Sequence, residues 1–570
     1  MNIYNSTKKI IIDILFNNFE KLNKDIERNI TCEQPKKEKF GDISTNVIMV
    51  ASKHLNLDKK LLYKILSKNI LKNKIFDKAS FVEPGFLNLN FSNTFWLGFL
   101  KTIHSEKNNY GFINIGKNKK INIEFVSANP TGPLHIGHLR GAVFGDVLSK
   151  LLSKSGFQVT KEYYVNDLGV QVDNLALSVK HHIENFLNNK KVPLKEHMYK
   201  GDYIKKIADD YINSKFSDRS DFESIKKFSV QSNLKQINDD LKSIGVTFDN
   251  YISEKENFNR GLVEKVIEKL ESQNDIYFGV LEKPKGKNDS HWKPIKQLLF
   301  RSSSYGDKTD RVIKKESGDI TYFASDIAYH YHKAERGYDE ILNVWGADHA
   351  GYIDRVKASL SALGYKNIIF TVKLCQIVNI IDKNKFIKMS KREGNFVLVS
   401  DILPKVGKDV LRFFMLTRKN DAHLDFDLEK SLQETNDNPS FYVQYAYARI
   451  NSLKKMALEK KIRLDKNNVK NININLSPPE VSIIKTLSLW PRIIETSVIS
   501  KEPHRLVYYL IELAGKFHAY WSLGKSDKNY KILGEENLDL SQGRLLLLDM
   551  IQSVIKSGLE LISVSVKDKM

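Results

Sequence analysis

The spacing of hydrophobic and polar residues differs from one part of the chain to another. Near the N-terminus, apolar residues from Ile11 to Leu22 recur at helical spacing, and the segment Phe86–Phe91 alternates as a strand does. This mixture predicts a small α+β domain over residues 1–110. A Gly- and Lys-rich connection over residues 111–120 marks its end.

Strands and helices alternate after this connection. Ile121–Ala128 is typical of a strand, Leu139–Leu151 carries an apolar residue every four positions, and Val159–Val165 is again typical of a strand. A strand, a helix and a strand in this order predict a βαβ unit with parallel strands. A second cluster of the same kind lies at Ile341–Trp345 and Ile368–Ile380, and the mostly polar, helical residues 171–300 between the two clusters resemble an insertion.

Only helical patterns remain from about residue 400 onward. Gly558 is expected to end the last helix as a C-cap, and the Asn- and Lys-rich segment 465–475 is expected to be a loop. The expected helices are Phe441–Leu453, Val481–Ile494, Leu506–Trp521 and Leu545–Ile555.

Composition narrows the class of protein. A chain of 570 residues with 41% hydrophobic positions predicts three to five folded domains and excludes a disordered chain. The formal net charge of +21 favours a polyanionic partner such as nucleic acid, although part of this charge reflects a general richness in Lys, Asn and Ile.

Two cysteines, Cys32 and Cys375, cannot form a disulfide framework or a Cys-based zinc site, which favours a cytoplasmic location. No apolar run approaches the roughly 18 residues that a membrane span needs, so we expect no membrane partner.

The segment Asn129–His138, NPTGPLHIGH, stands where a strand leads into a helix, which is the usual ligand crevice of a parallel sheet. A helix N-terminus offers free N–H groups to phosphates. His135 and His138 share one face of the first turn, where each could donate to an α-phosphate under attack, and Gly137 leaves room for an adenine ring. The alternative, which we consider the better interpretation of an isolated histidine, is a hydrogen-bonded core residue.

A second cationic segment, Lys388-Met389-Ser390-Lys391-Arg392, could clamp the β- and γ-phosphates of a nucleotide, although a solvated charge run is the commoner interpretation of such a loop. Other phosphate motifs fail, because Gly524-Lys525-Ser526 lacks the first glycine of a Walker A loop and no GxGxxG follows a strand. His330 and His332 are two residues apart on a helical segment and point to different sides, so no metal site is predicted.

Together, HIGH (His135–His138) and KMSK (Lys388–Lys391) resemble the signature of class I aminoacyl-tRNA synthetases. Several further segments are similar to the arginyl-tRNA synthetase family in particular, and the similarity covers nearly the whole chain. These segments are EFVSANP at 124–130, YVNDLG at 164–169, YFASDIAY at 322–329, VWGADHAGY at 344–352 and NPSFYVQYAYAR at 438–449. Tyr447 stands where this family often has histidine.

The resemblance implies an α/β fold with three parts. We expect a small α+β N-terminal tRNA-contacting domain, a Rossmann-like parallel-sheet catalytic domain and an all-α anticodon-binding bundle. The expected boundaries are 1–110, 118–400 with a helical insertion at about 171–300, a connecting segment at 401–434, and 435–570.

The same resemblance implies the activity of an arginine–tRNA ligase. ATP would activate L-arginine to arginyl-adenylate with release of pyrophosphate, and arginine would then pass to the 3′-terminal adenosine of tRNA(Arg). Mg²⁺ would accompany ATP without a dedicated protein cage. We expect a cytoplasmic monomer.

Residue roles follow from the same comparison of motifs. A guanidinium carries five donors and calls for carboxylates, and in this family acidic residues fill that role. The expected catalytic residues are His135, His138, Lys388 and Lys391, and the expected ATP-binding residues are Pro130, Gly137, Gly346, Asp348, His349, Met389 and Ser390. Arginine would be bound by Ser127, Asn129, Glu254, Tyr322 and Asp326, and tRNA by Gln444, Tyr445, Arg449, Asn88 and Asn90.

Alternatives remain at this stage. A class I synthetase for lysine would use similar carboxylates, and a nucleic-acid-binding protein could keep the fold without charging tRNA. Asp326 and Glu254 could be ordinary surface carboxylates, and Tyr445 could pack in the core of the helical bundle.

Overall fold

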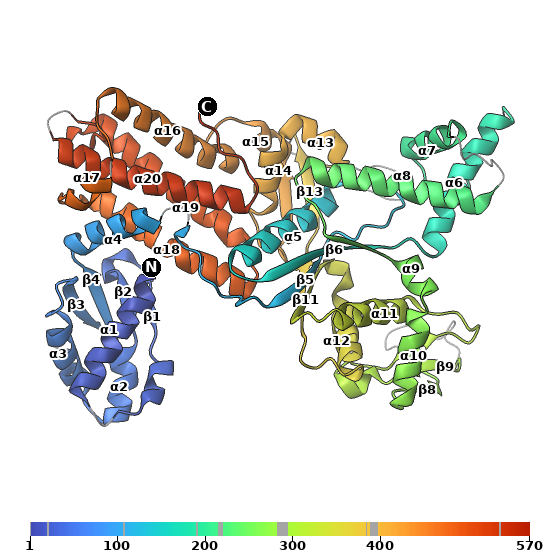
Figure 1. The fold of residues 1–570 in the computed structure, drawn as a ribbon, viewed down its shortest axis with the longest axis horizontal. Helices are drawn as coiled ribbons and strands as arrows, with labels where there is room; N and C mark the ends of the chain where they lie inside the picture. Colours follow the sequence, from blue (N-terminus) through green and yellow to red (C-terminus); the bar gives the residue numbers. More distant parts are fainter. Residues whose placement is uncertain are drawn as a thin grey trace.

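The computed structural model describes residues 2–19, 22–106, 109–189, 192–214, 221–281, 294–383, 385–387, 397–464, 466–534 and 537–570. Figure 1 shows the N-terminal domain below the C-terminal helices, with the central sheet beside them and two lobes of the insertion at the far side.

The N-terminal domain is a four-stranded antiparallel sheet with the order β1-β2-β4-β3, accompanied by three helices. The predicted mixture of helices and strands is confirmed, and β4 coincides with the predicted strand Phe86–Phe91. The first helix ends at Asn18, so the helix predicted from the apolar spacing up to Leu22 is too long at its C-terminal end, although Leu22 is itself buried. The elements are α1 (Ile3–Asn18), β1 (Cys32–Glu33), β2 (Ile43–Thr45), α2 (Val47–Leu55), α3 (Lys59–Ile70), β3 (Phe76–Val82) and β4 (Phe86–Phe91).

Five parallel strands form the central sheet, in the order β12-β11-β5-β6-β7. The predicted βαβ unit is β5, α5 and β6. Because β6 lies on one side of β5 and β11 on the other, the direction of winding reverses at β5, and a crevice opens there beyond the carboxyl ends of the strands. The elements are β5 (Lys120–Glu124), α5 (Ile136–Lys154), β6 (Gln158–Val165), β7 (Asn250–Ser253), β11 (Glu340–Gly346), α12 (Ile353–Ala362) and β12 (Ile369–Cys375).

The insertion between β6 and β11 forms two lobes, one of α6–α8 and one around α9–α11 (Figure 1). It is not purely helical, because it supplies β7 to the central sheet and contains a small antiparallel sheet with the order β10-β9-β8. Strands of four residues are too short to leave a periodic pattern, which is why the sequence did not reveal them. The elements are α6 (Val170–Leu187), α7 (Asp202–Ile212), α8 (Phe222–Ser243), α9 (Glu254–Asn259), α10 (Leu262–Ser272), β8 (Ile276–Gly279), β9 (Gln297–Phe300), β10 (Arg311–Lys314) and α11 (Tyr322–Glu335).

A third small sheet, with the order β14-β13-β15, follows the central one. The expectation of helices alone after residue 400 is therefore wrong at β15, which pairs in parallel with β13. The predicted strand Ile368–Ile380 is divided between β12 and β13, which belong to different sheets. The elements are β13 (Val378–Asp382), β14 (Lys385–Ile387), α13 (Val399–Val406), α14 (Lys408–Met415), β15 (Leu424–Asp427) and α15 (Leu428–Leu432).

The C-terminal part is helical, and the four long helices predicted from the sequence are confirmed. Gly558 lies inside the last helix and does not cap it; a Cβ there would lie 2.6 Å from Leu510 Cδ2, so glycine permits close packing of two helices. The segment expected to be a loop contains the short helix α17. The elements are α16 (Pro439–Glu459), α17 (Lys466–Asn471), α18 (Pro478–Ser500), α19 (His504–Ser526) and α20 (Leu538–Leu561).

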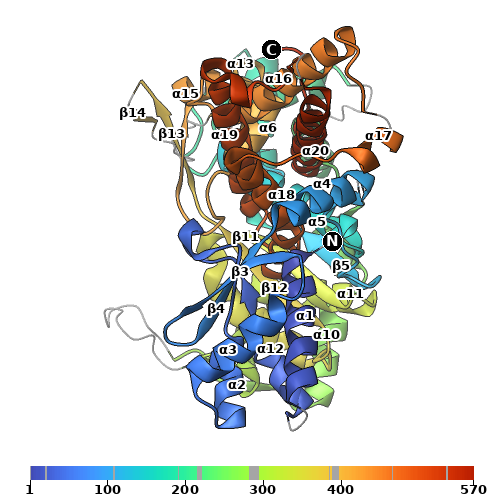
Figure 2. The same ribbon diagram turned by 90° about the vertical axis from the view of Figure 1, so that its left-hand side faces the viewer.

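Helix α4 (Asn93–Glu106) joins the N-terminal sheet to the C-terminal helices. Figure 2, which faces the N-terminal domain, shows α4 beside α18 and below α20. Asn93 and Leu476 exchange two hydrogen bonds of 2.8 and 3.0 Å, and the Tyr110 hydroxyl donates to the Leu487 carbonyl at 2.8 Å. One continuous hydrophobic cluster contains residues of all three parts.

Candidate active site

A strained turn follows β5 at the crevice. Val126 and Ser127 have φ values of 69° and 40°, a left-handed conformation that is costly for residues other than glycine. The Ser127 hydroxyl donates to Glu124 Oε1 at 3.0 Å and accepts from the Tyr164 N–H at 3.1 Å. These two bonds hold the turn against the carboxyl ends of β5 and β6.

A cavity of about 460 Å³ lies at the carboxyl ends of β5, β6 and β11; we refer to it as the β5–β11 cavity. All five residues predicted to bind the amino acid line it, although they come from segments up to about 200 residues apart: Ser127, Asn129, Glu254, Tyr322 and Asp326. Gly346 and His349, two of the predicted ATP-binding residues, line it as well. Asp348 lies beside them with a largely exposed side chain, 3.6 Å from the His349 ring.

Two carboxyl groups in this cavity have strongly perturbed acidity. Loss of solvation raises the pKa of Asp326 to about 7, and the charges of Glu254 and Glu124 push it in the same direction. Loss of solvation, with the charge of Asp167, likewise raises the pKa of Glu254 to about 7. Carboxylates in this situation gain from a cationic ligand, which would offset both the lost hydration and the mutual repulsion. The cavity is therefore suited to a cation.

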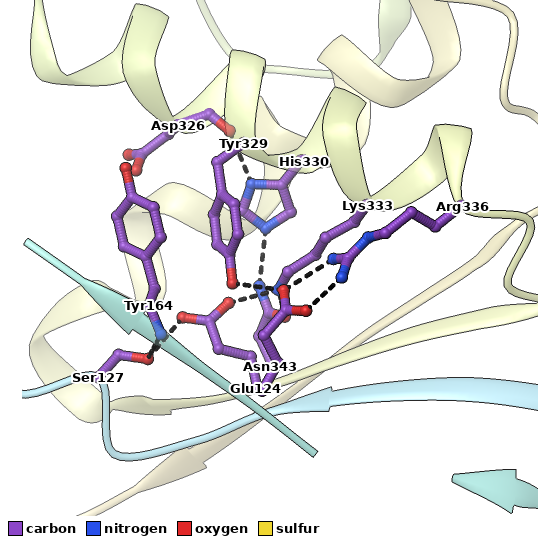
Figure 3. A network of polar contacts seen from close by, with 10 residues as sticks. Glu124, Ser127, Tyr164, Asp326, Tyr329, His330, Lys333, Arg336 and Asn343 are labelled. Carbon is purple, nitrogen blue, oxygen red and sulfur yellow. Dashed lines mark hydrogen bonds and ion pairs between the residues drawn. The ribbon is translucent and has the colours of Figure 1, made fainter. Parts of the chain in front are cut away.

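Beneath the cavity is a buried polar network (Figure 3). The His330 ring contacts the Asp326 carbonyl through Nδ1 at 2.8 Å and the Asn343 amide through Nε2 at 2.7 Å. Burial and the charge of Lys333 lower the pKa of His330 to about 3, so the ring is neutral and structural. Sequence reasoning missed Lys333, although it lies seven residues after Asp326 and thus on the same helix face.

The N-terminus of α5 fixes the two signature histidines. Nδ1 of His135 accepts from the Gly137 N–H at 3.1 Å, and Nδ1 of His138 accepts from the His135 N–H at 3.3 Å. With Nδ1 accepting, each neutral ring carries its proton on Nε2. The ring centroids are 3.9 Å apart, so both donors belong to one small site. A Cβ at position 137 would lie 2.9 Å from the His135 ring, which explains the glycine.

A second cavity, of about 560 Å³, lies in front of these histidines, and we refer to it as the α5 cavity. Asn129 and Gln171 line both cavities and are joined by a 2.7 Å hydrogen bond, so the two spaces adjoin. Pro130 lines neither cavity; it is buried, and its carbonyl accepts from Asn233 at 3.0 Å.

The KMSK residues Lys388, Met389, Ser390 and Lys391 lie outside the described residues, but both flanks of this segment are described. On one side β14 ends at Ile387. On the other side the Val397 carbonyl accepts from the Ile136 N–H at 3.1 Å, and the Val399 N–H donates to the Leu134 carbonyl at 3.0 Å. The fold thus fastens Val397 and Val399, which follow this segment, to the start of α5, about 260 residues away in sequence.

The candidate tRNA residues on α16 divide into two groups. Tyr445 and Arg449 are half-buried on one face; the Arg449 guanidinium lies 4.2 Å from the Tyr445 ring centroid and donates to its hydroxyl at 2.6 Å. Gln444 faces the interior, where its side chain is 1% exposed and donates to the Ser565 carbonyl at 2.8 Å. The structure therefore contradicts a surface role for Gln444, because adjacent helical positions point about 100° apart.

The N-terminal candidates also differ from each other. Asn88 is 3% exposed, because it is paired on both sides, with Ser44 of β2 and Ser80 of β3. It cannot offer its side chain to a partner at the surface, so this expectation is wrong. Asn90 is half-buried, near Gly41.

Family models match nearly the whole length of the chain in three parts. The arginyl tRNA synthetase N-terminal domain matches residues 5–91, the catalytic domain of class I (R) tRNA synthetases matches 100–435, and the DALR anticodon binding domain matches 443–570. Among the described residues, no helix has the length and apolar character to cross a membrane.

Curated proteins and solved structures agree with these matches. The chain is 41% identical to a protein of Wolbachia sp. subsp. Brugia malayi named arginine–tRNA ligase, with 100% of both chains covered. It is 40% identical to a protein of the same name from Roseobacter denitrificans, over 95% of this chain and 94% of the other. A structure titled putative arginyl-tRNA synthetase from Campylobacter jejuni aligns with a TM-score of 0.71 and 31% identity, over 84% of this chain and all of the other. The Thermus thermophilus arginyl-tRNA synthetase shares the fold over the full length of both chains, with a TM-score of 0.71 at 17% identity.

Proposed function

The chain belongs to the arginyl-tRNA synthetase family and, as an arginine–tRNA ligase, joins arginine to tRNA with the use of ATP; from this premise we propose where the site binds each substrate. The β5–β11 cavity holds arginine, and the α5 cavity beside it holds the phosphates of ATP. The observation that carries this proposal is the convergence of five candidate residues on one cavity with two carboxyl groups of raised pKa.

Asp326 and Glu254 pair with the guanidinium of arginine, since charge-assisted hydrogen bonds to a planar cation need carboxylates. Tyr322, whose side chain is 67% exposed at the mouth of the cavity, packs against the same group. Ser127 and Asn129 hold the α-amino and carboxylate groups at the opposite end. This orientation points the arginine carboxylate toward the α5 cavity.

His135 and His138 donate from Nε2 to the α-phosphate of ATP as charge develops on it. Gly137, Gly346, Asp348 and His349 surround the nucleoside, and Pro130 supports the turn. Lys388 and Lys391, with Met389 and Ser390 between them, clamp the β- and γ-phosphates. Mg²⁺ arrives with ATP and is held chiefly by its phosphates.

Two steps complete the reaction. A carboxylate oxygen of arginine attacks the α-phosphorus, the bond to the β-phosphate oxygen breaks, and pyrophosphate leaves. A ribose hydroxyl of the terminal adenosine of the tRNA then attacks the activated carbonyl, and AMP leaves with the bonding electrons. The protein contributes positioning and charge stabilisation, and no side chain acts as a nucleophile.

The tRNA is contacted away from the active site by Tyr445 and Arg449, which offer an aromatic plane and a cation. Asn90 belongs to a second contact on the N-terminal domain. The enzyme acts as a cytoplasmic monomer, and its net charge of +21 favours association with the polyanion.

ATP–pyrophosphate exchange with each amino acid, with and without tRNA, tests this proposal. Arginine should support exchange, and lysine should support little, since an ammonium cannot pair with two carboxylates in the bidentate way of a guanidinium. Exchange driven by lysine as strongly as by arginine would contradict the assignment of the cavity.

A further inference from the structure

A lysine without exposed surface lies directly beneath the β5–β11 cavity. The ammonium of Lys333, on α11, lies 2.5 Å from Glu124 Oε2, 3.0 Å from Asn343 Oδ1 and 4.4 Å from the centroid of the Tyr329 ring. Its side chain is 0% exposed. An ammonium buried this deeply is costly unless its acceptors are well placed, so the identity of those acceptors matters.

One acceptor connects Lys333 to the strained turn. Glu124 uses Oε2 for Lys333 and Oε1 for the Ser127 hydroxyl, at 3.0 Å. Ser127 in turn accepts from the Tyr164 N–H. The orientation of Glu124 therefore determines that of Ser127, the residue that holds the α-group end of the cavity.

The other acceptor connects Lys333 to the opposite wall. Asn343 accepts from Lys333 through Oδ1 and donates through Nδ2 to His330. His330 contacts the main-chain carbonyl of Asp326, two turns before Lys333 on the same helix. Figure 3 shows this continuous connection from Ser127 to Asp326, with Lys333 in the middle.

Sheet register explains why these groups meet. Asn343, Glu124 and Glu162 are paired positions on β11, β5 and β6, so they form one row across the sheet. Two neighbouring glutamates would repel each other, but each has a cation beside it: Lys333 of α11 pairs with Glu124, and Arg336, the C-cap residue of α11, pairs with Glu162 at 2.6 and 2.8 Å. Of these two glutamates, Glu124 lines the cavity.

We propose that Lys333 is the positioning residue of the arginine cavity: it holds Ser127 through Glu124 and Asp326 through Asn343 and His330, and it keeps Glu124 from pairing with the substrate. Because Glu124 lines the cavity, it would otherwise compete for the guanidinium with Asp326 and Glu254. Because Oε2 of Glu124 is paired with Lys333 and Oε1 is bonded to Ser127, the charge of Glu124 is already compensated, and the guanidinium pairs with Asp326 and Glu254 instead. The inference rests on the proposed function, because it presumes that arginine occupies this cavity.

Two variants test the proposal by steady-state kinetics. Lys333→Met leaves a buried carboxylate without its cation, and Lys333→Met combined with Glu124→Gln removes both charges while keeping an amide oxygen that can accept from Ser127, so the double variant avoids an unpaired buried charge. In both, the arginine KM should rise about tenfold or more while the ATP KM stays within about twofold of the parent value. If only the double variant folds, its arginine KM decides the question.

Arg336→Met is the matched control, since it breaks the neighbouring ion pair with Glu162, formed by the residue directly after the end of α11. Burial opposes ionisation of Glu162, but Arg336 and Lys333 outweigh it and lower the pKa of Glu162 to about 2, so this pair also contributes to stability. The control should lower the melting temperature and leave the arginine KM near the parent value. An unchanged arginine KM in a folded double variant, or an equal rise in the control, would overturn the proposal.

A parallel measurement on Asp326→Asn separates this proposal from the assignment of the cavity. If Asp326→Asn raises the arginine KM and the Lys333 variants do not, the positioning role alone is wrong. If Asp326→Asn has no effect either, arginine does not bind in this cavity and the proposed function fails.

Discussion

At the scale of single residues, the two carboxyl groups of the β5–β11 cavity are the most informative feature. Asp326 comes from α11 and Glu254 begins α9, and burial together with neighbouring carboxylates raises the pKa of both to about 7. Such groups are unfavourable in a protein without their ligand, which points to a substrate that carries a permanent positive charge.

Replacement of Asp326 by Asn removes one charge-assisted pair, which is worth roughly 1.5–3 kcal/mol. The arginine KM should rise about tenfold or more, and the ATP KM should change little. Asp319→Asn is a suitable control, because Asp319 is an exposed carboxylate bonded to Ser317, just before the same helix. Equal arginine KM values in the two variants would show that Asp326 does not contact the substrate.

The raised pKa values also predict how pH affects arginine binding. Without arginine, a carboxyl group with a raised pKa stays protonated above its ordinary pKa, so its contribution to stability is present at acidic pH and is lost as the pH rises toward about 7. Bound guanidinium favours the ionised form and restores that loss. Arginine should therefore raise the melting temperature more at about pH 7.5 than at about pH 6, measured by thermal denaturation. A shift that is the same at both pH values in the parent, or whose pH dependence is as large in Asp326→Asn as in the parent, would contradict the role of these groups.

At the scale of elements, the turn that begins α5 determines which ring nitrogen of each histidine accepts a main-chain hydrogen bond. Nδ1 of His138 accepts from the His135 N–H, so in the proposed reaction the donor to phosphate is Nε2. The amide nitrogen of a glutamine side chain can reach the position of Nε2, whereas that of asparagine corresponds to Nδ1.

His138→Gln should therefore retain more of the rate of adenylate formation than His138→Asn, measured by single-turnover kinetics. Both variants should bind ATP nearly as well as the parent, because the contact strengthens in the transition state. If His138→Asn is the faster of the two, or if both lose ATP affinity without loss of rate, this tautomer does not act on the phosphate.

The sequence could predict features formed by consecutive residues, but it could not predict features that depend on how the strands of the sheet pair. The HIGH turn could be located because strand, turn and helix N-terminus follow one another from residue 121 to 151. The row of Asn343, Glu124 and Glu162 could not, because only the pairing of three strands places these residues together. Short strands such as β15, and glycines that admit a neighbouring helix such as Gly558, likewise depend on contacts with distant segments.

At the scale of the whole molecule, the three parts share one hydrophobic cluster and exchange buried hydrogen bonds. The Arg412 guanidinium, for example, donates to the Ile562 and Ile244 carbonyls at 2.8 Å and to Asp146 at 2.6 Å, which ties the end of α20 to α5 and α8. Removal of residues 435–570 would expose this core, so point variants are the better test of tRNA binding.

Arg449→Ala should weaken tRNA binding and reduce its dependence on salt by about one unit of log–log slope, since one phosphate contact would be lost. The arginine KM in pyrophosphate exchange should stay unchanged. Footprinting of tRNA on the parent should reveal protection at the anticodon loop and at the elbow, and the variant should lose the former. Protection limited to the acceptor end of the tRNA would contradict the proposed roles of the N- and C-terminal parts.

The central claim, that arginine lies in the β5–β11 cavity with its guanidinium toward Asp326 and Glu254, is tested most directly by a crystal structure of the protein with arginine bound. We expect guanidinium nitrogens within hydrogen-bonding distance of both carboxylates, the α-amino and carboxylate groups beside Ser127 and Asn129, and Lys333 still paired with Glu124. Arginine bound in another cavity, or in this one with its guanidinium paired to Glu124, would contradict the account.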